Sequence, residues 1–195
     1  MKKIKKRGFL IDILRSKKTV FSFKDLILSW GNIDIKTAKV RVNYYTNNDQ
    51  LYPIRRGFYA KDKNYDRFEF ATKIFTPSYV SFESVLGAAG VTFQNYSQIF
   101  VASYQSKEID CDNQKYCFKT IKNSILTNNA GILNRDNYSI ATPERAFLDV
   151  IYLQKDYHFD NLSTLNWDKV SEILPIYGGN KRMEKMVKKY KIDVA

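Results

Sequence analysis

The chain has 195 residues and a mass of 22.8 kDa, which suits one domain of ordinary size or two small ones. Hydrophobic residues make up 44% and charged residues 27%, as in an average globular protein, so a disordered chain is not expected. No run of 18 apolar residues is present, which argues against a transmembrane helix. The apolar stretch after the basic residues 1–7 is too short for a signal peptide, so we expect a cytoplasmic protein.

Cysteine and histidine are scarce, which limits the chemistry to be expected. Two thiols, Cys111 and Cys117, cannot form a disulfide framework, and a structural zinc site needs about four ligands. A cysteine nucleophile would need one of these thiols to meet His158, the single histidine, in space. We therefore expect neither a metal site nor a cofactor.

The net charge of +12 is distributed unevenly along the chain. Residues 1–63 hold 16 Lys/Arg and 5 Asp/Glu, whereas residues 64–180 hold 10 and 13. Residues 181–195 hold 6 and 2. A general enrichment in lysine would spread the charge evenly, so this asymmetry predicts a nucleic-acid-binding module joined to a nearly neutral one.

Three short helices are expected in the basic third. The first covers residues 9–14, and the second is capped by Ser22 and ended by Gly31. Asp34 is a good N-cap for the third, which ends at residues 47–49.

The third helix has two different faces. Apolar side chains at about 100° per residue predict its core-facing side, namely Ile35, Ala38, Val42 and Tyr45. The other side mixes amide, hydroxyl, aliphatic and cationic groups, which suit base edges, thymine methyl groups and phosphates. We expect the major groove to be faced by Lys36, Thr37, Val40, Asn43 and Tyr44, and phosphates to be contacted by Lys39 and Arg41. An ordinary solvated helix is the alternative.

A small hairpin follows. Residues 51–54 and 58–60 look like two strands around Arg55, Arg56 and Gly57, where the glycine supplies the backbone freedom that the turn needs. Pro53 restricts the first strand to a sheet edge. Three short helices followed by a hairpin are the arrangement of a winged helix-turn-helix. Arg55 and Arg56 are then expected on the wing, at phosphate or in the minor groove.

The polar residues 61–69 predict a linker, which gives two domains, 1–63 and 70–195. The second domain alternates short strand-like and helix-like segments, so we expect a mixed α/β domain with a small antiparallel sheet and an α+β class overall. Ser81 looks like the N-cap of a helix over 82–89.

The clearest helix start in the chain is Thr142-Pro143-Glu144, which supplies an N-cap, a proline at the first helical position and an acid near the positive helix end. Two further helices are expected over residues 165–174 and 180–190. Glu144, Arg145 and Asp149 share the helix that starts here, and capping or salt bridges explain them more simply than catalysis does.

One segment has a carboxylate pattern found in metal-dependent enzymes. Glu108, Asp110 and Asp112 alternate along a predicted strand, and such carboxylates can hold Mg²⁺ for phosphoryl transfer. The glycine-serine turn that a nucleotidyltransferase needs upstream is absent, so an exposed hairpin edge is the favoured interpretation. A metal-dependent nucleotidyltransferase or nuclease stays an alternative.

Three motifs together resemble a known family. They are Arg56-Gly57-Phe58-Tyr59, the segment Tyr79-Val80-Ser81-Phe82-Glu83-Ser84-Val85-Leu86, and Ala141-Thr142-Pro143-Glu144-Arg145-Ala146-Phe147-Leu148-Asp149. In this order and spacing the chain resembles the AbiEi family of antitoxins and transcriptional regulators over about residues 8–155. The last motif is the most specific of the three.

The resemblance implies the antitoxin of a bacterial type IV toxin–antitoxin and phage-defence system. Its winged helix-turn-helix would bind inverted repeats of double-stranded DNA in its own promoter and repress the operon. Its C-terminal domain would counter a nucleotidyltransferase-like toxin without a stable complex. We expect no catalysis by the chain itself. The alternative function is a stand-alone regulator with a dimerisation or sensor domain. Binding to DNA by one copy and by two paired copies are both open.

Overall fold

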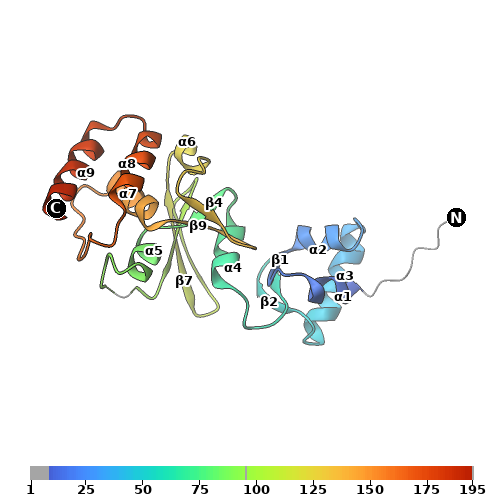
Figure 1. Ribbon diagram of the computed structural model, residues 1–195. Helices are drawn as coiled ribbons and strands as arrows, with labels where there is room; N and C mark the ends of the chain where they lie inside the picture. Colours follow the sequence, from blue (N-terminus) through green and yellow to red (C-terminus); the bar gives the residue numbers. More distant parts are fainter. Residues whose placement is uncertain (1–8, 95, 195) are drawn as a thin grey trace. The chain divides into compact units, whose positions relative to one another are not determined.

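The computed structural model describes residues 9–94 and 96–194 (Figure 1). These residues form an α+β protein with nine α-helices, a three-stranded antiparallel sheet and a six-stranded mixed sheet. They divide into two compact units with the boundary between Phe70 and Ala71. The basic start of the chain, residues 1–7, lies outside the described residues. Within the described ranges, no helix is long and apolar enough to span a bilayer.

The N-terminal unit alternates helices with very short strands. Its elements are α1 (Phe9–Arg15), β1 (Val20–Ser22), α2 (Phe23–Ser29), α3 (Ile35–Asn47), β2 (Tyr52–Arg55) and β3 (Phe58–Ala60). β3 lies between β1 and β2 and pairs antiparallel with both. The edge position that Pro53 predicts is confirmed, because β2 has a single partner strand. Strand β1 could not be predicted from the sequence, because three residues are too few to show an alternating pattern.

The core of this unit joins all three helices to the sheet. Its buried members are Ile13, Phe21, Leu26, Trp30, Ala38, Val42 and Leu51. The predicted cap of α2 is confirmed, because the Ser22 hydroxyl accepts a bond from the Asp25 amide while the Asp25 carboxylate accepts one from the Ser22 amide. Such a reciprocal pair satisfies two amides that the helix itself cannot.

The predicted linker over residues 61–69 is wrong in its second half. Tyr65 and Glu69 are buried, and the Glu69 carboxylate accepts bonds from the Thr19 amide and hydroxyl at 2.8 and 2.7 Å. The Thr19 hydroxyl in turn accepts a bond from the Asp66 amide. These residues look like a linker in sequence because their polar groups are satisfied by Thr19, about fifty positions away.

The C-terminal unit is built on the larger sheet. Its strands are β4 (Ser78–Val80), β5 (Ile99–Ser103), β6 (Lys107–Cys111), β7 (Gln114–Thr120), β8 (Ile132–Asn134) and β9 (Ser139–Ala141). Its helices are α5 (Glu83–Ala88), α6 (Asn123–Leu126), α7 (Pro143–Leu153), α8 (Trp167–Ile173), the 3₁₀ helix η1 (Leu174–Tyr177) and α9 (Lys181–Val194), while α4 (Arg67–Ile74) crosses the unit boundary. Helices α5, α7, α8 and α9 lie together beside the sheet (Figure 1).

The expectation of a small antiparallel sheet is corrected by the strand order β6-β7-β5-β4-β9-β8. β5 pairs parallel with β7, and β4 pairs parallel with β9 through Val80 and Ile140. Hairpins such as β6–β7 join strands that follow one another in the chain, whereas the parallel pairs β5–β7 and β4–β9 join strands with at least one other strand between them. The sheet is therefore larger than expected and mixed, because its parallel pairs cannot be predicted from the pattern of a single segment.

The helix caps of this unit agree only in part with the sequence. Thr142 caps α7 by accepting a bond from the Arg145 amide, with Pro143 in the first turn, as predicted. The cap predicted for Ser81 is wrong. Phe82 occupies the cap position of α5 with a φ of +55°, and the Ser81 hydroxyl instead donates to Asp149 at 2.7 Å. A buried carboxylate is the stronger acceptor for this hydroxyl.

Candidate nucleic-acid interface

The start of α3 is fixed by its own side chains. Asp34 accepts a bond from the Thr37 amide at 2.9 Å, and the hydrogen bonds from Thr37, first from its side chain and then from its backbone, lower the pKa of Asp34. The cap predicted at Asp34 is thus confirmed. The N-cap carboxylate of Asp34 already accepts one of the free amides at this helix end, so the positive end of α3 is partly neutralised by the chain itself.

The exposed face of α3 carries most of the residues predicted to contact DNA. Val40 is 69% and Tyr44 61% exposed, so both side chains are accessible to a partner. The other exposed members are Lys36, Lys39 and Asn43. Thr37 and Arg41 are half-buried. The face therefore offers two exposed lysines and an amide beside apolar groups, side chains of the kinds that can contact base edges.

The opposite face of α3 differs from the predicted one at its first residue. Ala38 and Val42 are buried, and Tyr45 packs against the core at its edge, with its ring 6.0 Å from that of Trp30. Ile35, which was expected in the core, is 60% exposed. It occupies the first helical position, one turn before Ala38, and so lies beyond the end of the core.

The hairpin arginines are exposed side chains on a constrained turn. Arg55 ends β2 opposite Phe58, next to an irregularity in the register, and Arg56 occupies the turn. Gly57 has a φ of +84°, and its carbonyl accepts a bond from the Phe23 amide at 2.8 Å. This bond ties the hairpin turn to the start of α2. The two guanidinium groups thus extend from a backbone that the rest of the unit holds in place.

Lys61, which directly follows β3, has a structural role that could not be predicted from the sequence. The Lys61 ammonium donates to the carbonyl of Leu14 at 3.1 Å and to that of Ser16. These carbonyls lie at the end of α1, where helical acceptors have no partner of their own. Charge counting alone would have included Lys61 among the cations for DNA.

The most specific sequence motif forms a buried polar cluster in the C-terminal unit rather than a surface site. Arg145 and Asp149 are fully buried on α7, with 3.3 Å between Arg145 Nε and Asp149 Oδ1. Asp149 also accepts bonds from three hydroxyl groups, those of Tyr79, Ser81 and Tyr177, at 2.7 to 3.0 Å. The carboxylate therefore joins β4 and η1 to α7.

The other side of this buried cluster is satisfied by backbone carbonyls. Arg145 donates to Ile125, Asn128 and Ala130, at 2.8, 3.3 and 2.6 Å. Burial, reinforced by the charge of Asp149, raises the pKa of Tyr79, which therefore remains a neutral donor. Since all these groups are occupied with one another, they hold the fold of the unit. Tyr177 lies outside the three motifs, and only the structure reveals its part.

Of the three carboxylates of the alternative enzyme hypothesis, Glu108 and Asp110 lie on the edge strand β6, whereas Asp112 lies beyond its end. Asp110 is opposite Lys115 in the β6–β7 register, and the exposed Glu108 lies 3.4 Å from the Lys115 ammonium. Asp112 occupies the following turn with a φ of +53°. Across residues 9–94 and 96–194, no group of three or more His, Cys, Asp or Glu side chains is arranged to hold a metal ion.

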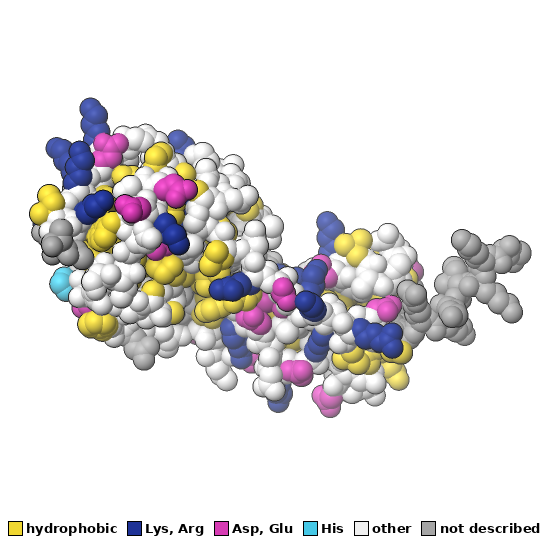
Figure 2. Space-filling view, in the orientation of Figure 1, with side chains coloured by type: hydrophobic (Ala, Val, Ile, Leu, Met, Phe, Trp, Pro, Cys, Tyr) yellow, Lys and Arg dark blue, Asp and Glu magenta, His cyan; other side chains and the backbone are white. Residues whose placement is uncertain are grey.

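A second basic surface lies over α9, where Figure 2 shows lysine and arginine side chains gathered. Met183 and Val187 are buried and anchor the helix, so its lysines face outward. The exposed members are Lys181, Lys185, Lys188, Lys189 and Lys191. Arg182 differs from them, because it donates to the Tyr152 carbonyl at 2.9 Å.

Comparison with known proteins does not extend this description. No model of a known protein family matches the chain, and no curated protein is significantly similar to it.

Proposed function

We propose that the chain is a DNA-binding antitoxin that represses its own operon and opposes a nucleotidyltransferase-like toxin. The observation that carries the DNA-binding part is the element order α1–β1–α2–α3–β2–β3 with β3 in the middle of the sheet. Winged helix-turn-helix domains have this order. In such domains the helix equivalent to α3 enters the major groove and the hairpin forms the wing.

The charge distribution supports the same proposal. Residues 1–63 hold 16 Lys/Arg against 5 Asp/Glu, and Lys36, Lys39, Arg55 and Arg56 are exposed. Lysine and arginine side chains that neutralise phosphates release counterions, which makes binding strongly dependent on salt. Val40, Asn43 and Tyr44 would then supply contacts to base edges, and the arginines would contact phosphate or the minor groove.

The antitoxin part rests on the resemblance of three motifs to the AbiEi family. The most specific of them supplies Arg145 and Asp149 to a cluster that is buried inside the C-terminal unit. In this proposal the motif maintains the unit, and other residues on its surface oppose the toxin. The chain itself would catalyse no reaction.

The DNA-binding part is tested with the full chain and a labelled duplex from its own promoter. We expect specific binding that weakens by about 10³- to 10⁵-fold between 50 and 200 mM salt. A scrambled duplex of the same length serves as the control, and the experiment is repeated with EDTA. Equal affinity for both duplexes would contradict operator recognition. Loss of binding in EDTA, or turnover of labelled nucleotide, would favour the metal-dependent enzyme instead.

The antitoxin part is tested by co-expression with the product of the neighbouring reading frame. We expect the neighbouring product to arrest growth when it is expressed alone and the chain to restore growth. Repression of the promoter without restored growth would contradict the antitoxin role and leave a stand-alone regulator. The two experiments are independent, so either part of the proposal can fail alone.

A further inference from the structure

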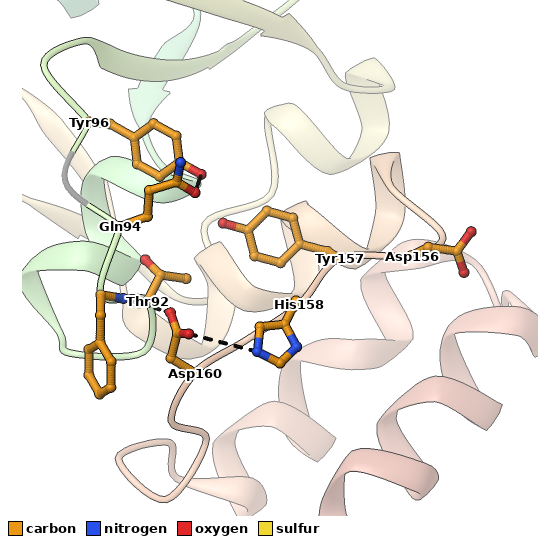
Figure 3. A pocket seen from close by; sticks show the side chains of 8 residues that line it. Thr92, Gln94, Tyr96, Asp156, Tyr157, His158 and Asp160 are labelled. Carbon is orange, nitrogen blue, oxygen red and sulfur yellow. Dashed lines mark hydrogen bonds and ion pairs between the residues drawn. The ribbon is translucent and has the colours of Figure 1, made fainter.

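The C-terminal unit contains a cavity of about 280 Å³ between two loops. One loop follows α5 and supplies Thr92, Phe93, Gln94 and Tyr96, and the other follows α7 and supplies Asp156, Tyr157, His158 and Asp160. Figure 3 shows Gln94, Tyr96, Tyr157, His158 and Asp160 around a common space, whereas the carboxylate of Asp156 points away from it. The volume suits a small organic molecule.

The walls of this cavity are held in place before any ligand arrives. The amides of Asp160 and Asn161 donate to the Val91 carbonyl at 3.0 and 3.1 Å, and Asp160 Oδ2 accepts a bond from the Phe93 amide at 2.7 Å. On the other side the Tyr190 hydroxyl of α9 donates to the Tyr157 carbonyl at 3.1 Å. A ligand would therefore meet a preformed site and spend little free energy on ordering it.

The charge of the lining is opposite to that of the chain. The chain has a net charge of +12, yet the described residues around the cavity include no lysine or arginine, and the carboxylate that faces the cavity is that of Asp160. Such a lining disfavours phosphate and nucleic acid, because neither would find a cation to pair with. Asp160 Oδ2 accepts the Phe93 amide, so Oδ1, which lies 3.7 Å from His158 Nε2, is the oxygen that remains for a cation.

Aromatic rings complete the lining. Tyr96 and Tyr157 contribute two rings, and Phe93 contributes the amide that bonds Asp160. The face of an aromatic ring attracts ammonium and guanidinium groups, and rings combined with a carboxylate are how proteins recognise such ligands. Burial raises the pKa of Tyr157, so its phenol remains neutral and can accept a hydrogen bond from a cation.

We propose that this cavity binds an organic cation that presents a guanidinium or primary ammonium group, with Asp160 as its counterion and the rings of Tyr96 and Tyr157 beside the cation. A metal ion would be a poorer occupant, because Asp160 Oδ2 already accepts a backbone bond and no group of three ligating side chains exists among the described residues. The site belongs to the C-terminal unit and does not depend on DNA binding.

His158 makes the proposal easy to test, because it is the single histidine of the chain and lies at the cavity. Its imidazole proton signals in the NMR spectrum of the full chain can be followed without ambiguity during a titration. The probes are butylguanidinium and butylurea, which have the same shape and differ in charge. We expect saturable shifts with butylguanidinium and none with butylurea at the same concentration. Equal shifts with both, or no saturation, would overturn the proposal.

Two variants locate the cation. Asp160→Asn removes the charge and keeps an oxygen that can accept the Phe93 bond, so the loops should stay folded, as amide signal dispersion will verify. We expect the affinity for butylguanidinium to fall about ten-fold. Asp156→Asn removes the same charge from a carboxylate that points away, and should leave the affinity within about two-fold. Equal losses in both variants would indicate diffuse attraction and contradict a defined site.

A third probe identifies the source of the cation. N-acetyl-arginine-N-methylamide presents the guanidinium group as a protein side chain does. Tighter binding of this probe than of butylguanidinium would indicate a basic side chain of another protein. Weaker binding would indicate a free small molecule. Both results support a cation site, whereas the absence of binding by either guanidinium compound contradicts it.

Discussion

Arg145 and Asp149 form an ion pair within one turn of α7, with 3.3 Å between Arg145 Nε and Asp149 Oδ1 and no exposure of either side chain. A buried pair of this kind resists the removal of one partner, because the remaining charge loses its counterion in a medium that solvates it poorly. The motif over residues 141–149 therefore stabilises the fold of the C-terminal unit, since it supplies both members of this buried pair.

Replacing Asp149 by asparagine should lower the free energy of unfolding by about 3–5 kcal/mol, because Arg145 would be left as an unpaired buried charge. Urea unfolding followed by circular dichroism measures this loss. Glu108→Gln is the control, since it breaks an ion pair with Lys115 whose side chains are 64% and 50% exposed. The control should change stability by less than about 1 kcal/mol. Similar losses in both variants would show that burial of the Arg145–Asp149 pair is unimportant.

Gly131→Ala should be more harmful than an ordinary glycine substitution. Gly131 has a φ of +70°, and a Cβ atom there would lie 2.8 Å from both Arg145 Cβ and Ile173 Cδ1. Gly178 has a similar φ of +74° with nothing within 4 Å, so Gly178→Ala isolates the backbone cost. In thermal unfolding, we expect Gly178→Ala to lower the free energy of unfolding by about 1–2 kcal/mol. Gly131→Ala should lower it by about 1–3 kcal/mol more. Equal losses would contradict the close approach.

Stability should decline above about pH 10, where tyrosines ionise in the unfolded chain. Burial and the neighbouring Asp149 raise the pKa of Tyr79 and Tyr177, so the folded chain keeps protons that the unfolded chain releases. Stability from these tyrosines is fully present below pH 10 and is lost as the pH rises.

The variant Tyr177→Phe should be less stable at neutral pH, because Asp149 loses a donor at 2.7 Å, but should depend less on pH above about 10. Urea midpoints between pH 8 and 11 measure the slope. Tyr44→Phe, on the exposed face of α3, is the control and should leave the slope unchanged. A slope in Tyr177→Phe equal to that of the unmodified chain would refute this account.

The double substitution Arg55→Ala and Arg56→Ala should weaken binding to all duplexes. It should also reduce the slope of log affinity against log salt concentration by the amount expected for about one to two phosphate contacts. Fluorescence anisotropy at several salt concentrations measures this slope. Lys107→Ala with Lys155→Ala removes the same charge from exposed sites in the C-terminal unit and should leave the slope nearly unchanged. An unchanged slope in the arginine variant would count against the wing assignment.

Asn43→Ala should change which base is preferred at one operator position, because an amide can bond two atoms of adenine at once. We expect a loss of about 1–3 kcal/mol of discrimination at that position with the salt dependence retained. Binding to a set of operators with single base changes measures it. Asn129→Ala, exposed in the other unit, should leave all preferences intact. A uniform loss across the set would place Asn43 at the backbone of the DNA instead.

Features that depend on neighbouring residues could be predicted from the sequence. The caps at Ser22, Asp34 and Thr142 were predictable because each cap bonds the amide three positions later. The buried side of α3 was predictable from the helical period, except at Ile35, where the helix extends beyond the core. The uneven charge was visible by counting alone.

Features that join distant segments could be seen only in the folded chain. The parallel pairing of Val80 with Ile140 and the bonds from Tyr79 and Tyr177 to Asp149 connect residues between 28 and 70 positions apart. The cavity beside His158 likewise needs two loops, which the bond between the Phe93 amide and Asp160 joins across 67 positions. A local sequence pattern predicts whether a segment is a helix or a strand, but not which segment packs against it. That partner depends on which apolar surfaces are still exposed as the chain folds.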